Sequence, residues 1–197
     1  MPAADNEDPR FQEHMKWLGH VAAISASLDL SVNMTIWELA NVERWIGACL
    51  TTQIFSPSSR FRVLISLVHV RGGKPEIISK IHKCAESAGG LSRRRNSYVH
   101  DTWAVDESTG EVKRIHVTME GAFSFGFTPT SVDELKRLYD DIQDGIRRFD
   151  LLREEIFRSL PPWPRTQFSL SRGIRSYPLD RSSGQQEPQP PPQSSKE

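Results

Sequence analysis

Apolar side chains recur at spacings of three and four through most of the first 160 residues, which is the pattern of amphipathic helices. The clearest helix start is the capping box formed by residues 131–134, and the helix that it opens should end before Pro161. Gly89 and Gly90 either kink the preceding helix or divide it in two. Four helices are predicted upstream of the capping box, from Pro9 to Leu30, from Thr35 to Ser56, from Pro57 to Gly72 and from Pro75 onward.

The hydrophobic period changes from helical to alternating after the fourth predicted helix. Alternating apolar positions on either side of a turn at residues 106–110 predict a β-hairpin, whose polar face, with His116, should be solvated. Glycines predict an irregular segment after the hairpin, docked onto the bundle by Phe123, Phe125 and Phe127. The predicted fold class is therefore mainly α, with about five helices in a bundle and a small β-hairpin before the last helix.

Composition divides the chain into three parts. Residues 1–8 are predicted to be a flexible N-terminus, residues 9–160 a helical domain, and residues 161–197 a Pro/Ser/Gln-rich tail that is largely disordered. No apolar run approaches the roughly 20 residues of a membrane span, and the N-terminus does not resemble a signal peptide. We therefore expect a cytoplasmic protein without membrane association, with Cys49 and Cys84 as small, reduced core residues.

The formal net charge is zero, so any contact with RNA must come from a local basic patch. The stretch from Leu91 to Trp103 combines concentrated positive charge with a histidine, His100. At about 100° per residue, Arg93 and Asn96 project on the same side of this helix as His100. Arg95 projects roughly 140° away, toward a partly buried face, and an arginine there needs a carboxylate or backbone partner.

The spacing from Arg95 through Asn96 to His100 resembles the R-x(4-6)-H signature of HEPN domains (higher eukaryotes and prokaryotes nucleotide-binding) of the bacterial type. The resemblance implies a homodimer of helical bundles with a metal-independent endoribonuclease site at the dimer interface and no cofactor. His100 would then be the general acid or base in transesterification by the RNA 2′-hydroxyl. Arg95 with Asn96 would stabilise the phosphate. Further RNA contacts are expected from Arg93, Arg94 and Tyr98, and an antitoxin-like protein is an expected partner.

A second hypothesis describes a non-catalytic helical dimer that acts as a protein-interaction or regulatory module. In that case Arg95 is a structural ion-pair partner and His100 a surface residue. Asp101 follows His100 where the family often has glycine, and a negative charge there disfavours the approach of a phosphate. A cleft at a two-fold axis would favour the enzyme, whereas an arginine and histidine remote from a cleft would favour the module. Dimer contacts are expected on the first two helices, at Trp17, Trp37 and Trp45.

Overall fold

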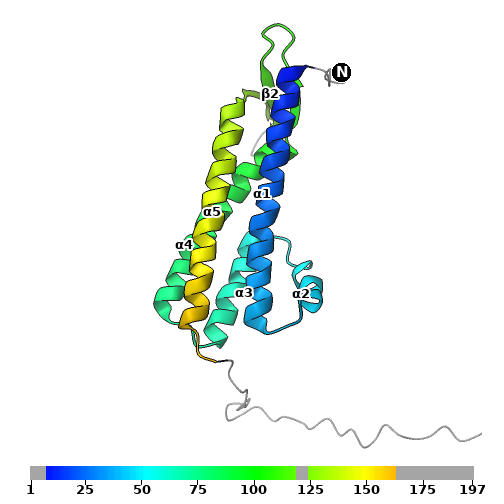
Figure 1. Ribbon diagram of the computed structural model, residues 1–197. Coiled ribbons are helices and arrows are strands. Elements are labelled where there is room, and N and C mark those ends of the chain that lie inside the picture. The colour runs from blue at the N-terminus through cyan, green and yellow to red at the C-terminus, as the bar shows by residue number, and fades with distance from the viewer. Residues whose placement is uncertain (1–7, 119–123, 163–197) are drawn as a thin grey trace, which may run out of the picture. The chain divides into compact units, whose positions relative to one another are not determined.

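The computed structural model describes residues 8–118 and 124–162. Within these ranges it contains five helices and a three-stranded antiparallel sheet inserted before the last helix, which confirms the predicted mainly α fold class (Figure 1). The predicted flexible N-terminus and disordered tail lie outside the described residues except for Asp8, Pro161 and Pro162. The elements are α1 Pro9–Ala40, α2 Arg44–Thr51, α3 Pro57–Val70, α4 Pro75–His100, β1 Thr102–Val105, β2 Val112–Thr118, β3 Ser124–Pro129 and α5 Val132–Ser159.

The first helix is longer than the sequence predicted. The expected break at residues 31–33 and the expected helix start at Thr35 are wrong, because α1 continues to Ala40. Thr35 is buried inside this helix, and its hydroxyl donates a hydrogen bond to the carbonyl oxygen of Ser31 at 2.8 Å instead of capping a new helix. The helix ends at Asn41, whose backbone is left-handed with φ of 53°. The second helix is accordingly only the eight residues of α2.

The predicted site residues lie on α4, which packs against α5. The helix α4 passes through Gly89 and Gly90 without a break, so the glycine pair does not divide it. The predicted capping box of α5 is present, with the hydroxyl of Ser131 accepting from the amide of Glu134. A Cβ atom at Gly145 of α5 would lie 3.0 Å from Leu91 of α4, so this glycine lets the two helices approach closely.

The main core lies where α1, α3, α4 and α5 meet. Phe61 of α3 packs edge to face on Phe149 of α5, with ring centroids 5.9 Å apart, and both side chains are fully buried. His14 of α1 is buried, and one of its ring nitrogens lies 2.8 Å from the carbonyl oxygen of Thr130. No helix in the described part of the chain is long and apolar enough to cross a membrane. Of the two cysteines, Cys49 is exposed and not a core residue, whereas Cys84 is half-buried, and burial raises the pKa of its thiol.

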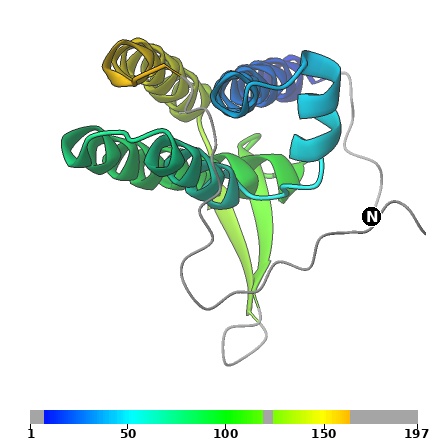
Figure 2. The same cartoon turned by 90° about the horizontal axis from the view of Figure 1, so that it is seen from below.

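The sheet has the order β1-β2-β3 and projects to one side of the helices (Figure 2). The segment predicted to be irregular forms the third strand, so that expectation was wrong, and Phe123 lies outside the described residues. The alternation of β2 was predicted correctly and Ile115 is buried as it predicts, but the polar positions of β2 do not form a solvated face. Arg114 and His116 are half-buried on the side that carries the buried Trp103, whereas Phe125 and Phe127 are exposed by 53% and 59% on the opposite side.

Candidate functional site

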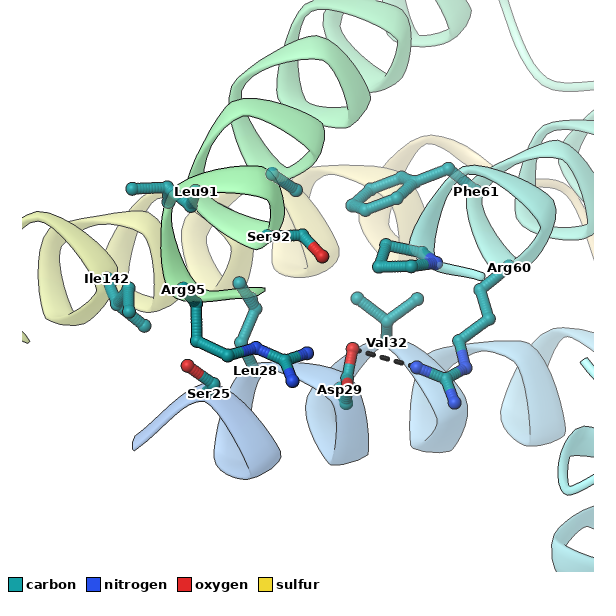
Figure 3. Close-up of a pocket in the computed structure, with 12 residues that line it drawn as sticks. Ser25, Leu28, Asp29, Val32, Arg60, Phe61, Leu91, Ser92, Arg95 and Ile142 are labelled. Carbon is teal, nitrogen blue, oxygen red and sulfur yellow. Dashed lines mark ion pairs between the residues drawn. The ribbon is translucent and has the colours of Figure 1, made fainter. Parts of the chain in front are cut away.

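Arg95 lies in a pocket between α1, α3 and α4, with α5 at one edge (Figure 3). The floor and walls are mainly apolar, and the polar groups come from three helices: Ser25 and Asp29 on α1, Arg60 on α3, and Ser92 and Arg95 on α4. The apolar lining residues are Leu28, Val32, Pro57, Phe61, Ala88, Leu91 and Ile142.

The charges in this pocket do not cancel. Asp29 pairs with Arg60, with Oδ1 and Nη1 2.8 Å apart. Figure 3 shows the guanidinium groups of Arg60 and Arg95 on opposite sides of Asp29. Arg95 forms no hydrogen bond or ion pair with any residue in the described ranges, and the buried Nε atoms of both arginines have no partner there. The carboxylate that Arg95 was expected to need is therefore present in the pocket but is bonded to a different arginine.

His100 lies away from this pocket, as the helical spacing predicted. It is the last residue of α4 and is exposed, as are Arg93 and Asn96. These three side chains occupy positions one and two helical turns apart on one face of α4. None of the three makes a hydrogen bond or ion pair within the described part of the chain. A guanidinium, an amide and an imidazole are thus free to contact a ligand on this face.

Two further residues predicted to bind nucleic acid, Arg94 and Tyr98, instead contact other residues of the chain. Arg94 Nη1 donates to Asp141 Oδ2 of α5 at 2.6 Å, although both side chains are about half exposed. Tyr98 is half-buried, and its ring stacks on Trp103 with centroids 6.4 Å apart while the guanidinium of Arg114 lies 4.2 Å above it. Tyr98 therefore fixes the end of α4 to the sheet.

The structure thus brings Arg93, Asn96 and His100 together and separates Arg95 from them. Sequence reasoning missed Asp29 and Arg60, which complete the pocket around Arg95. The only local signal was a charged residue directly beside a core position, as in Leu28-Asp29 and Arg60-Phe61. Such positions are common at the edges of amphipathic helices, so the pairing appears only when the helices are assembled.

Comparisons with protein-family models, with curated proteins and with solved structures return no match to this chain. Within residues 8–118 and 124–162, no group of three or more histidine, cysteine or acidic side chains is placed to hold a metal ion.

Proposed function

We propose that this chain is a non-catalytic helical module that acts by protein–protein contact and assembles as a homodimer. The observation that carries the proposal is a set of exposed apolar side chains within residues 45–55, on α2 and the turn that follows it. Trp45 is 70% exposed, Leu50 58%, Phe55 87% and Ile46 36%. We call these four residues the α2 patch. Monomeric proteins rarely leave large contiguous apolar patches in water, and such patches mark interaction sites.

The helix that carries the α2 patch packs against Trp37 of α1. Gly47 faces the indole of Trp37 so closely that a Cβ atom there would lie 2.4 Å from the ring. Trp37 Nε1 also donates to the Thr51 hydroxyl at 3.1 Å. Trp37 is therefore engaged inside the protomer, and Trp17 is half-buried against Tyr139. Of the three tryptophans expected at a dimer contact, Trp45 presents the most apolar surface.

The position of the α2 patch separates the two hypotheses. The helix α2 and the end of α4 that carries His100 lie at opposite ends of the bundle (Figure 1). A two-fold axis through the α2 patch would leave the two copies of His100 far apart, so it would not create a shared ribonuclease site. An interface of standard size buries about 800 Å² per partner, and the α2 patch would be its apolar centre.

Sedimentation velocity at tens of micromolar protein tests the assembly, because an interface of standard size holds together at this concentration. The wild type should sediment as a dimer, and Trp45→Glu with Phe55→Glu should yield a folded monomer. The matched control is Phe125→Glu with Phe127→Glu, which places two charges on the exposed apolar face of the sheet and should leave the dimer intact. A monomeric wild type, or a dimer lost only in the sheet variant, would contradict the proposal.

A second candidate function is supported by the free polar face of α4. Arg93, Asn96 and His100 could hold and cleave a phosphodiester without a metal, with Arg93 in the role that the HEPN resemblance gives to Arg95. This candidate needs a dimer formed at the sheet end of the bundle, which brings the two copies of His100 close together. RNA as substrate and an antitoxin-like protein as partner belong to this candidate only.

A further inference from the structure

We propose that the pocket between α1, α3 and α4 is a binding site for a small monocarboxylate, which pairs with Arg95. This site is distinct from the α2 patch and from the polar face of α4, and the inference does not depend on how the protein assembles.

The charge of the pocket favours a ligand with a single negative charge. Two guanidinium groups, Arg60 and Arg95, share one carboxylate, Asp29, which leaves one positive charge. The ion pair between Asp29 and Arg60 is partly shielded from solvent, since the two side chains are 34% and 16% exposed. Arg95 has no such partner in the described residues, and its buried Nε is an unused donor. A monocarboxylate would make the pocket neutral, with one carboxylate for each arginine, whereas a phosphate dianion would leave it negative.

The donor groups of the pocket are suited to a carboxylate. The cavity measures about 20 Å³, which is room for about one water molecule. At most one oxygen of a ligand therefore fits inside the cavity, and the rest of the ligand lies at its mouth. A guanidinium matches a carboxylate in a planar, bidentate geometry. The Ser92 hydroxyl makes no hydrogen bond in the described structure and is a second donor for the ligand. Partly buried apolar lining residues such as Leu28 and Pro57 suit a short hydrocarbon chain at the mouth.

The test is a titration of the full chain with propionate, followed by the NMR signals of the arginine Nε–Hε groups. The Arg95 signal should move and saturate with propionate, and should not saturate with chloride or inorganic phosphate at equal ionic strength. Arg95→Gln should raise the Kd for propionate by at least about tenfold, the cost of one charge-assisted hydrogen bond. Ser92→Ala should raise it by a smaller factor. Arg62→Gln removes the same charge from an exposed position on α3 and should leave the Kd unchanged.

Three results would overturn the proposal. The first is an Arg95 signal that does not respond to propionate in the wild type, a measurement that does not depend on any variant being folded. The second is saturation by phosphate at lower concentration than by propionate. The third is tighter binding of a blocked glutamate than of propionate, which would assign the pocket to an acidic side chain of a partner protein.

Discussion

The carboxylate that follows His100 is neutralised within the fold: Asp101 Oδ2 accepts a hydrogen bond from Arg114 Nη1 at 3.0 Å. The two side chains are only 19% and 14% exposed. Arg114 also donates through Nε to the Thr130 hydroxyl at 2.9 Å and covers the ring of Tyr98. The negative charge that the sequence places beside His100 is therefore directed toward the sheet and paired there.

Arg114→Met should lower the free energy of unfolding by about 1–3 kcal/mol, because it leaves a partly buried carboxylate without its partner. Urea unfolding followed by circular dichroism measures the change. The control is Arg147→Ala, which removes an ion pair whose side chains are 64% and 56% exposed. Exposed pairs of this kind contribute about 0–1 kcal/mol. Equal effects of the two substitutions would show that the pair of Asp101 and Arg114 does not join α4 to the sheet.

Gly47→Ala should destabilise the protein by about 1–3 kcal/mol, because the new methyl group would overlap the indole of Trp37 and displace α2. Gly19→Ala is the matched control in an open part of α1, with no heavy atom within 4 Å of the added Cβ. That substitution should stabilise the helix by about 0.5–1 kcal/mol. Thermal unfolding measures the stability of both variants. If Gly47→Ala left the stability unchanged, α2 would not be held against Trp37.

The turn between β1 and β2 should contribute less to the stability of the fold in acid than at neutral pH. Hydrogen bonds from the Lys113 ammonium and then from Ser108 hold the pKa of the Asp106 carboxyl far below its usual value. A depressed pKa in the folded state stabilises the protein above the unfolded pKa of about 3.9. This stabilisation is lost as the pH falls through the lower folded value.

Asp106→Asn should therefore lower the urea midpoint at pH 7, and the difference from the wild type should shrink as the pH falls below about 4. Lys113→Met removes the largest cause of the shift and should reduce the same pH dependence. Parallel midpoints of the wild type and Asp106→Asn from pH 7 to pH 3 would contradict this account.

Short sequence motifs predicted a helix end correctly where the hydrogen bonds that fix that end lie within the motif. The capping box at Ser131 marked the start of α5 correctly because both of its hydrogen bonds lie within four residues. The same type of signal failed at Thr35, because a threonine inside a helix can satisfy its hydroxyl on the preceding turn. The predicted alternation of β2 was correct, but it could not show which face meets the helices. Arg114 takes the inner face because Asp101, Tyr98 and Thr130 are there to receive it.

The candidate site was predicted only in part for a similar reason. Helical geometry alone separated Arg95 from Arg93, Asn96 and His100, and the exposures in the structure agree with that separation. The pairing of Asp29 with Arg60 joins two helices across 31 positions of the chain. No spacing rule within one helix connects such residues, so the pocket around Arg95 could not be predicted.

RNA cleavage separates the two candidate functions, because only the ribonuclease candidate uses the polar face at the end of α4. We expect purified wild type to leave single-stranded RNA intact in EDTA, because Arg95 lines the pocket and His100, on another face of the same helix, does not. Gel analysis of a labelled RNA measures cleavage, and detection of 2′,3′-cyclic phosphate ends identifies its products. His69→Ala, at an exposed position on α3, is the control for any contaminating activity.

EDTA-resistant cleavage that falls by about 100-fold in both His100→Ala and Arg93→Ala, but not in Arg95→Ala, would replace the interaction module with a ribonuclease built on the free face of α4. Cleavage that depends on Arg95 and not on Arg93 would instead assign the phosphate to the arginine named by the HEPN resemblance. That result would require Arg95 to leave its pocket when RNA binds. The Arg95 Nε–Hε signal would then lose its response to propionate in the presence of RNA, so one titration would connect the two sites on this helix.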